Sequence, residues 1–482
     1  MAFDLIQFTD QLRYLPYRDW SKEYQQKLVE KVATSPWRAM YHTETPTGLL
    51  NDPNGFSYFN GEWQLFYQYY PFGPVHGLKS WFRLTSEDLF HWERQGIALE
   101  ADTAFDSHGA YSGSAIATDK GLFAFYTGNV RDKDWERTPY QNGAWMDTNG
   151  RIEKLEKPLI TPPDFVTDHF RDPNIFYYEG VYYALFGAQL KETLKGAILL
   201  YRCEVDTLDD WRYIGKLDIG ETELGYMVEC PAITFVDNHP VLLFCPQGLP
   251  KAIDDYQNIY PNKYIVGDAF DPDNVRIVNP SAMRNIDEGF DYYAATTANG
   301  AHDEALTVAW IGLPEIAYPT DDYGYQGALT MVRELSLKEG QLYQTPIIPK
   351  TTLGEEIVIK DKGDLGHNHY HLSSSISFGE KTTLRFFTGA EDNQALTLTI
   401  EENGAVTLDR SKTPDSVGED YGVSRTTRLR EQEYIQIDAY IDESIIEIFF
   451  NQGEKVMTAR YFPKKGHTGV EVANAKIREI KR

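Results

Sequence analysis

Hydrophobic periodicity divides the chain into a short helical start and a long region of strands. Residues 22–33, KEYQQKLVEKVA, place Leu28, Val29 and Val32 on one helical face, and a Ser-Pro pair follows. After Pro36, short aromatic and β-branched runs alternate with Gly, Asn, Asp and Pro. This pattern predicts many short strands joined by tight turns.

The strand-rich region contains a repeat. DPNGFSYFNGEWQLFYQ begins at Asp52 and DPNIFYYEGVYYALFGA begins at Asp172; the two segments share Phe, Tyr and Phe at equivalent positions and a Gly at the turn. Looser copies begin at Ser112, Glu229 and Asp291, so successive starts are 57–62 residues apart. Five similar units of this length indicate a five-bladed β-propeller, and a large β-sandwich is the alternative.

In a propeller, equivalent positions of successive blades lie at equivalent places around the axis. Three repeat starts are carboxylates followed closely by Pro, so Asp52, Asp172 and Glu229 are expected to meet at one end of the channel. Converging acids repel, which raises the pKa of one of them. A neutral acid beside ionised carboxylates is what cleavage of a glycosidic bond needs. Turn chemistry alone could explain one Asp-Pro-Asn, but not two copies in register with Glu229.

From about residue 350 the pattern changes to alternating strands with hairpin turns. This predicts a separate antiparallel β-sandwich. The expected fold is therefore all-β, a five-bladed β-propeller followed by a C-terminal antiparallel β-sandwich. The expected division is an N-terminal helical extension over 1–35, a propeller catalytic domain over 36–349 and a sandwich domain over 350–482.

Composition excludes some classes of binding partner. Lys and Arg number 46 against 72 Asp and Glu, a formal net charge of −26, which argues against a nucleic-acid partner and a polybasic membrane anchor. The start of the chain does not resemble a signal peptide and no apolar run is long enough to span a membrane, so we expect a cytoplasmic protein. Nine Trp, 32 Tyr and 25 Phe would suit stacking on sugar rings, so a small sugar is the expected partner.

Other chemistries find little support. There are three cysteines, Cys203, Cys230 and Cys245, and they form no C-x-x-C pair. This pattern argues against a disulfide framework and against a cysteine zinc site. The segment HNHYH contains three alternating histidines, His367, His369 and His371. They could share one strand face as metal ligands, but a solvated strand face is the preferred interpretation. We expect no cofactor and no metal. No G-x-S-x-G accompanies a Ser/His/Asp set, so acyl transfer is unsupported.

Several segments together resemble glycoside hydrolase family 32, the invertase-like enzymes. They are HTETPTGLLNDPNGFSYFNGEWQLFYQYYPFGPVHGLKSW at 42–81, YSGSA at 111–115, FRDPNIF at 170–176, YMVECPAI at 226–233, MVRELSL at 331–337 with YQTP at 343–346, and SIIEIFFNQGEKVMTARYFP. The resemblance runs from about residue 36 to the end. It implies a five-bladed propeller with a β-sandwich and retaining hydrolysis of β-fructofuranosides.

The resemblance also implies roles. Asp52 would be the nucleophile at the fructosyl C2, Glu229 the general acid and then the base, and Asp172 the group that holds fructose hydroxyls as positive charge develops. The two reacting carboxyls would be about 5–5.5 Å apart. Further positions match those that line the fructose subsite: Asn51, Gln68, Trp81, Tyr111, Ser112 and Arg171.

The chain departs from the family pattern near the leaving-group side. Leu49 and Leu50 stand where many members have Trp-Met or a similar pair, and we expect them to contact substrate. Phe82-Arg83 replaces a frequent Gly-His, and Val228 replaces a frequent Trp before the acid. These changes preserve the reaction type and leave the second sugar open.

The resemblance narrows the substrate to fructosides. Family members without signal peptides commonly cleave sucrose 6-phosphate delivered by a sugar phosphotransferase system, and VHGLKSW resembles that subgroup. A phosphate needs a cation, which Lys79 or Arg83 could supply. Sucrose, short fructo-oligosaccharides and fructosyl transfer are alternatives. Two other classes stay open: a non-catalytic carbohydrate-binding propeller, and an inverting pentosidase with its carboxyls about 6.5–9.5 Å apart.

Overall fold

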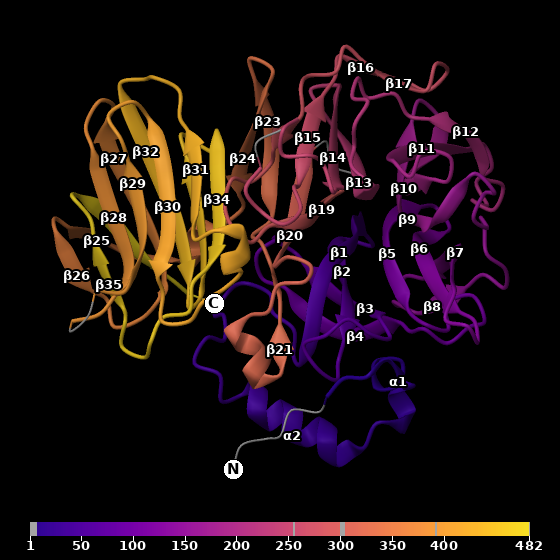
Figure 1. The fold of residues 1–482 in the computed structure, drawn as a ribbon, viewed down its shortest axis with the longest axis horizontal. Coiled ribbons are helices and arrows are strands. Elements are labelled where there is room, and N and C mark those ends of the chain that lie inside the picture. The colour runs from indigo at the N-terminus through magenta and orange to yellow at the C-terminus, as the bar shows by residue number, and fades with distance from the viewer. Residues whose placement is uncertain (1–6, 254–255, 299–303, 391–392, 482) are drawn as a thin grey trace.

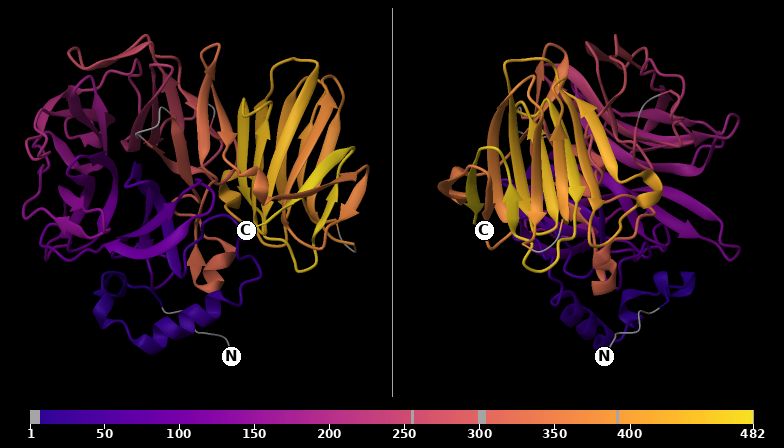
Figure 2. Two further views of the ribbon diagram at one scale, coloured as in Figure 1. Left: turned by 180° about the vertical axis from the view of Figure 1, so that it is seen from behind. Right: turned by 60° about the vertical axis from the view of Figure 1, so that its left-hand side comes forward.

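The computed structural model describes residues 7–253, 256–298, 304–390 and 393–481, and strands dominate them. Two all-β bodies lie side by side, and a short helical segment lies beneath the larger one (Figure 1). The same arrangement is visible from behind and from the side in Figure 2. The expected all-β fold, with a propeller followed by a sandwich, is confirmed. The expected division at residues 35/36 and 349/350 stays a prediction.

The larger body is built from five sheets that correspond to the five repeats. Blade 1 contains β1 (Gly48–Phe59), β2 (Glu62–Tyr70), β3 (Ser80–Ser86) and β4 (Glu93–Leu99). Blade 2 contains β5 (Ala110–Thr118), β6 (Gly121–Arg131), β7 (Arg137–Met146) and β8 (Ile152–Lys154). Blade 3 contains β9 (Val166–Tyr178), β10 (Val181–Leu190), β11 (Gly196–Cys203) and β12 (Arg212–Lys216).

The last two blades are less regular. Blade 4 contains β13 (Met227–Val236), β14 (His239–Gln247), β15 (Lys263–Val266) and β18 (Arg284–Asn285), beside the hairpin of β16 (Ala269–Asp271) and β17 (Arg276–Val278). Blade 5 contains β19 (Tyr293–Ala298), β20 (Leu306–Ile311), β23 (Arg333–Lys338) and β24 (Gln341–Pro346), with β22 (Ala328–Leu329) beside β20. The turn expected between β19 and β20, at 299–303, lies outside the described residues.

The ring of blades is closed by a strand from far along the chain. After blade 5 begins, the 3-10 turn η2 (Pro319–Tyr323) leads into β21 (Tyr325–Gln326), which pairs in parallel with the start of β1. Gly48 lies opposite Tyr325 in this pairing. The first and last parts of the propeller are therefore joined by backbone hydrogen bonds, and β21 covers the edge of β1 at the seam.

Every inner strand is bulged at the same place. The pairing with the second strand shifts register between Leu50 and Pro53, Ala110 and Gly113, Arg171 and Asn174, Glu229 and Ala232, and Tyr293 and Thr296. A bulge bends its strand and redirects one side chain. In the first four blades the bulges coincide with the repeat starts, so they turn Asp52, Asp172 and Glu229 toward one another.

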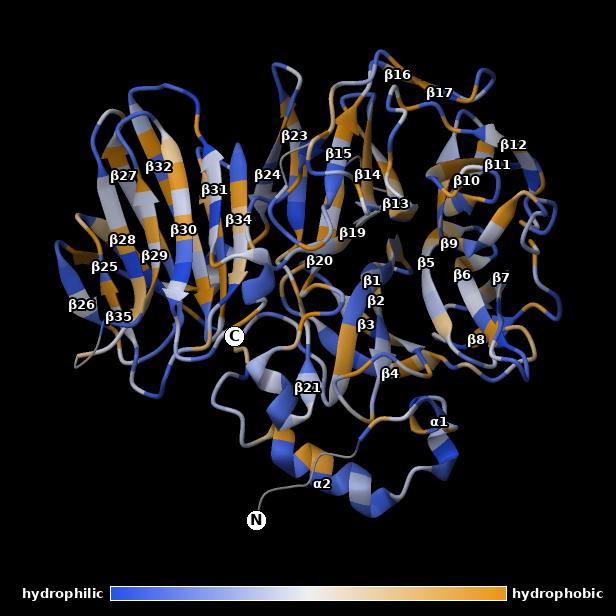
Figure 3. Cartoon of the chain, viewed as in Figure 1, coloured by the Kyte–Doolittle hydropathy of each residue, from blue (hydrophilic) through white to orange (hydrophobic). Residues whose placement is uncertain are grey.

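The second body is a β-sandwich of two six-stranded sheets. One sheet contains β25 (Leu353–Ile359), β36 (Ala475–Ile480), β27 (His369–Ser377), β32 (Tyr434–Asp442), β33 (Ile445–Phe450) and β34 (Lys455–Arg460). The other contains β26 (Lys362–Asp364), β35 (Gly469–Glu471), β28 (Thr382–Thr388), β29 (Ala395–Ile400), β30 (Ala405–Lys412) and β31 (Ser424–Arg428). Hydrophobic and polar positions alternate along these strands (Figure 3). On β27 and β30 the hydrophobic side chains face the buried core between the sheets.

The helical segment is anchored to blade 1. Its elements are α1 (Asp10–Arg13), the 3-10 turn η1 (Tyr17–Asp19) and α2 (Lys22–Val32). Helix α2 confirms the helix predicted from the periodicity, and Ser21 caps it. Leu28 is buried, whereas Val29 is 51% exposed, so Val29 does not share the buried face as expected. Tyr17 Oη donates to Leu78 O at 2.7 Å, which fixes the segment to the loop before β3. Within the described ranges, every helix is too short or too polar to cross a bilayer.

A buried ionic network joins the propeller to the sandwich. His42 Nδ1 lies 2.9 Å from Asp442 Oδ2, and its Nε2 lies 3.0 Å from Glu447 Oε1. Glu447 also accepts from Arg333 Nη2 at 2.5 Å, and Arg333 donates to Asp287 at 3.2 Å. All these side chains are buried. Burial lowers the pKa of His42, but the two carboxylates outweigh this effect and raise it to about 9 from 6.5.

This network predicts a pH-dependent stability. Because the folded-state pKa of His42 lies above 6.5, its contribution to stability is complete below about pH 6.5 and is lost as the pH rises through about 9. His42→Gln should destabilise the protein by about 3–5 kcal/mol near neutrality, because it removes the positive charge between two buried carboxylates. Guanidinium unfolding at about pH 7 and about pH 10 measures the difference from wild type, which should shrink at the higher pH. An equal difference at both pH values would contradict this assignment.

Candidate active site

The structure brings three carboxylates together from different blades. Asp52 lies on β1, Asp172 on β9 and Glu229 on β13. Cys230 Sγ lies 3.8 Å from Asp52 Oδ2 and 3.7 Å from Asp172 Oδ2. Arg171 connects Asp172 with Glu229, because its guanidinium lies 3.9 Å from the first carboxylate and 2.7 Å from the second. Residues separated by 177 positions in sequence therefore share one site.

Backbone geometry at the bulges positions these groups. Asp172 has φ 63° and Cys230 has φ 46°, conformations that non-glycine residues adopt at a cost of about 1–3 kcal/mol each. Two hydrogen bonds hold these conformations: Asp172 N donates to Thr127 Oγ1 at 3.0 Å, and Cys230 N donates to Asp172 Oδ2 at 3.0 Å. The surrounding structure thus maintains local strain at the point where the carboxylates meet.

Asp52 is held by hydrogen bonds on both of its oxygens. Asn51 Nδ2 donates to Oδ1 at 3.0 Å, while Gln68 Nε2 and Ser112 Oγ donate to Oδ2 at 3.1 and 2.5 Å. Burial raises the pKa of Asp52, and the charge of Glu229 adds to this effect, whereas the Ser112 and Asn51 hydrogen bonds oppose it. The carboxylate is immobilised with little freedom to rotate.

Glu229 has a different environment. Oε1 accepts from Arg171 Nη2 at 2.7 Å, and Oε2 accepts from Gln247 Nε2 and Tyr293 Oη, each at 2.7 Å. Its side chain keeps 18% exposure, against 7% for Asp172. Of the two, Glu229 is the carboxylate with more access to solvent and to an incoming group.

The pKa of Asp172 shows the effect of placing three acids together. This pKa is raised to about 7: burial is the largest cause, Arg171 opposes it, and the charges of Glu229 and Asp52 add to it. The repulsion expected among converging acids is therefore present. Burial and the same carboxylates also raise the pKa of Cys230, so its thiol stays protonated and unreactive.

Gln247 and Tyr293 were not anticipated from the sequence. Gln247 ends β14, one strand outward from Glu229, and Tyr293 begins the inner strand of blade 5. Tyr293 comes two residues after the expected fifth repeat start, Asp291, which lies elsewhere and accepts from Arg410 Nη1 at 3.0 Å at the boundary with the sandwich. An alignment of the five repeats that allowed an offset of two residues would have found Tyr293.

Several expected sugar contacts lie behind the site. Leu49 and Leu50 have no exposed surface and belong to the hydrophobic core of blade 1. Trp81 is equally buried, and its Nε1 donates to Tyr111 O at 2.9 Å. These three side chains support the site wall in this structure. Tyr111 itself is partly exposed, and its hydroxyl lies 3.4 Å from that of Tyr14 in the helical segment.

The structure contradicts the expected phosphate contacts. Lys79 is fully buried, donates to Asn51 Oδ1 and has its pKa lowered by burial to about 7, so it acts behind Asp52. Arg83 Nε donates to Gln64 Oε1 at 2.9 Å, and Arg83 lies against Glu62 at the β1–β2 turn. Because β1 runs from the carboxylates to that turn, Arg83 lies at the opposite end of the blade from them.

The three alternating histidines lie on the sandwich. His371 Nε2 lies 2.9 Å from Asp438 Oδ1, and His369 lies between Glu443 and Glu479 at 3.4 and 3.5 Å. Ligand atoms of His367, His369 and Glu479 come within 4.8 Å of one another. His369 and His371 on β27 are thus paired with carboxylates, unlike the solvated face that was preferred.

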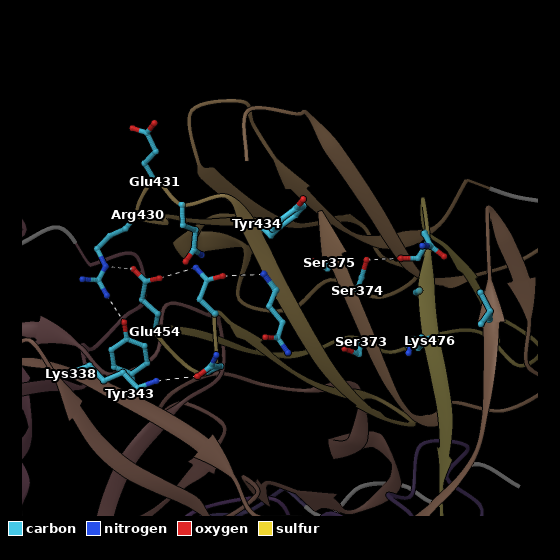
Figure 4. Close-up of a pocket in the computed structure, with 17 residues that line it drawn as sticks. Lys338, Tyr343, Ser373, Ser374, Ser375, Arg430, Glu431, Tyr434, Glu454 and Lys476 are labelled. Carbon is cyan, nitrogen blue, oxygen red and sulfur yellow. Dashed lines mark hydrogen bonds and ion pairs between the residues drawn. The ribbon is translucent and has the colours of Figure 1, made fainter. Parts of the chain in front are cut away.

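A cavity of about 790 Å³ lies on the outer face of the sandwich beside blade 5 (Figure 4). Its polar side chains bond largely to one another: Arg430 Nε donates to Glu454 at 2.8 Å, and Asn451 Nδ2 donates to the same carboxylate at 2.8 Å. None of the three converging carboxylates lines it. The chemistry described above therefore belongs to the propeller.

Comparison with known families agrees with this architecture. The model of the glycosyl hydrolases family 32 N-terminal domain matches residues 42–346, and the family 32 C-terminal model matches residues 338–481. A sucrose-6-phosphate hydrolase of Streptococcus mutans is 45% identical, covering 96% of this chain and 97% of that protein. One from Lactococcus lactis is 42% identical, covering 99% and 100%.

Solved structures show the same fold. The sucrose-6-phosphate hydrolase of Lactobacillus gasseri superposes with a TM-score of 0.95 at 40% identity, covering 98% of this chain and 99% of that one. A family 32 β-fructofuranosidase of Bombyx mori, in complex with sucrose, gives a TM-score of 0.82 at 26% identity, covering 96% and 98%. The fold, the family matches and the near full-length similarity together show that this chain belongs to glycosyl hydrolase family 32.

Proposed function

We propose that this protein is a retaining β-fructofuranosidase that hydrolyses the fructosyl bond of sucrose 6-phosphate. The similarity over nearly the whole chain to sucrose-6-phosphate hydrolases carries this proposal. The arrangement of Asp52, Asp172 and Glu229 supports it from the side of the chemistry. Such a reaction needs a nucleophile and a proton donor on either side of the scissile bond, and the site contains a candidate for each.

In the first step, the ionised Asp52 attacks the fructosyl C2. The bond from C2 to the bridging oxygen breaks, and Glu229 gives its proton to that oxygen, so the second sugar leaves as an alcohol. Hydrogen bonds from Asn51, Gln68 and Ser112 keep Asp52 aimed at the anomeric carbon. The product of this step is a fructosyl ester of Asp52.

In the second step, water replaces the departed sugar. Glu229, now a carboxylate, takes a proton from this water, whose oxygen attacks C2 and displaces Asp52. One water is consumed, Glu229 is protonated again, and two inversions give fructose with retained configuration. Arg171, Gln247 and Tyr293 position Glu229 for both proton transfers through their hydrogen bonds to its oxygens.

Asp172 acts on the positive charge that develops on the sugar in the transition state of each step. Its carboxylate accepts hydrogen bonds from fructose hydroxyls, which strengthen as the sugar becomes oxocarbenium-like. A cationic sugar beside Asp172 also favours its ionised form, against the burial that raises its pKa to about 7. Substrate and Asp172 therefore stabilise each other most in the transition state.

The second candidate is unphosphorylated sucrose, the ligand of the related Bombyx mori enzyme. The phosphorylated sugar is preferred because the relatives that share at least 40% identity act on it by name. A phosphotransferase system makes such a sugar inside the cell, so this substrate implies a cytoplasmic enzyme.

Side-by-side values of kcat/KM on sucrose 6-phosphate and sucrose test the proposal, with Asp52→Ala as the blank. Wild type should prefer the phosphorylated sugar by about 10- to 100-fold, the effect of one or two hydrogen bonds to a charged group. Equal turnover of both sugars would remove the phosphate preference and leave a general fructosidase. Turnover of neither sugar would overturn the assignment.

A further inference from the structure

Three arginines lie near one another in a protein whose net charge is −26, and one of them, Arg171, bonds to Glu229. Arg131 ends β6 and Arg137 begins β7, and the two lie directly opposite each other in the pairing of these strands. Like charges at directly opposite positions destabilise a sheet. Arg171, from blade 3, adds a third positive charge that acts on Arg137. Such a cluster costs stability unless an anion occupies it.

His169 joins two of these arginines. Its Nδ1 lies 2.9 Å from Arg171 Nη1 and 3.5 Å from Arg137 Nη2. Guanidinium groups only donate, so Nδ1 accepts and the ring proton lies on Nε2. Burial, followed by the charges of Arg171 and Arg137, lowers the pKa of His169 to about 4. At neutral pH His169 is therefore an uncharged ring with one N–H left to donate.

The cluster retains unused donor capacity. Arg137 Nε donates to Asp168 Oδ2 at 3.0 Å, and in the part of the chain that the structure describes its Nη1 has no hydrogen-bond partner. Asp168 is 47% exposed, so its screening of Arg137 is weak. Arg131 forms no ion pair within the described ranges; its Nη1 donates to Trp135 O at 2.9 Å and its guanidinium lies over the Trp135 ring.

The position of the cluster matches the geometry of the reaction. Arg171 bonds to Glu229 with one side of its guanidinium and to His169 with the other, and Arg137 follows. Glu229 marks the side from which the leaving sugar departs. In sucrose 6-phosphate the phosphate is on that glucose unit, several bonds from the oxygen that receives the proton. Glu229, Arg171, His169 and Arg137 form a row of contacts that begins at this proton donor.

We propose that Arg137, with the N–H of His169, forms the subsite for the phosphate of the leaving sugar, and that Arg131 adds long-range attraction. This proposal rests on the proposed function and names the groups that bind the phosphate. A bidentate guanidinium suits a phosphate better than a single ammonium group does. A phosphate in this subsite would offset the repulsion between Arg131 and Arg137.

Arg137→Gln tests the subsite, with Lys133→Gln as the matched control. Lys133 lies in the same β6–β7 turn and is 89% exposed, so the control removes the same charge without removing the contact. Values of kcat/KM are measured on sucrose 6-phosphate and on sucrose for wild type and both variants. Arg137→Gln should lower the ratio of the two values by about 10- to 100-fold, while Lys133→Gln should keep the wild-type ratio.

Binding of glucose 6-phosphate and of glucose by calorimetry supplies a second readout that does not depend on turnover. Arg137→Gln should weaken binding of the phosphorylated sugar selectively. A wild-type preference that survives in Arg137→Gln, in both ratio and binding, would overturn the subsite and leave the proposed function intact. A wild type without any preference would overturn the phosphorylated substrate itself. Equal effects of both variants would reduce the cluster to long-range attraction and also overturn the subsite.

Discussion

Asp52→Asn should lower kcat on sucrose 6-phosphate by at least about 10⁴-fold, the scale seen when a catalytic nucleophile is removed. The amide keeps the size of the side chain and can still bond to Ser112, but it cannot form the ester with C2. KM should change little, because Asp52 is already occupied by protein donors in the free enzyme. Steady-state kinetics and mass spectrometry of the denatured enzyme measure both effects.

Glu229→Gln provides the comparison for this experiment. It retains the nucleophile and loses the proton transfers, so a fructosyl adduct can still form on the protein, whereas Asp52→Asn should show none. An adduct in Asp52→Asn, or turnover near the wild-type rate, would assign the nucleophile to another residue. An adduct at a different carboxylate would also show that another residue is the nucleophile.

Asp172→Asn should move activity and stability in opposite directions. Loss of the charge that stabilises the oxocarbenium-like sugar should lower kcat by roughly 10²–10³-fold. In the folded protein the pKa of Asp172 is about 7, against 3.8 without perturbation, so ionising this carboxyl destabilises the fold as the pH rises between these values. Asparagine is neutral at every pH and avoids this destabilisation.

Thermal unfolding at about pH 8 and about pH 4 separates the two effects. The variant should be more stable than wild type at the higher pH, and the difference should largely disappear at the lower pH, where wild-type Asp172 is also neutral. Lower stability of Asp172→Asn at the higher pH would show that the Arg171 contact outweighs burial. Unchanged kcat would remove Asp172 from the chemistry.

The repeat in the sequence was sufficient to predict the propeller and the convergence of its acids. Asp52, Asp172 and Glu229 occupy equivalent bulges on inner strands, so periodicity alone carried spatial information. Asp291 shows the limit of this argument: blade 5 is offset by two residues, and Asp291 bonds to Arg410 at the sandwich. Equal spacing of the repeat starts misses this offset, and an alignment that allows a shift of two residues is needed to find Tyr293.

Side-chain direction was harder to predict than position. Leu49, Leu50 and Trp81 are close to Asp52 in sequence or sheet, yet all three are buried among hydrophobic neighbours. The consecutive residues Leu49 and Leu50 point to opposite faces of β1, so both faces of this strand are covered there. Arg83 is two residues from Trp81 on β3, but its partners lie at the far end of the blade. Arg137 has no neighbouring motif, and only the pairing of β6 with β7 shows the charge cluster.

The closing strand has a consequence for how the enzyme is made. Gly48 pairs with Tyr325, so the ring cannot close until about 277 further residues have been synthesised. At about 5–20 residues per second this takes roughly 14–55 s on a ribosome. During the first part of that interval Asp52 has been made but Glu229 and Tyr293 have not, and throughout it the start of β1 lacks its partner β21. Nascent chains should therefore need protection from association, and truncation before residue 325 should leave the seam open.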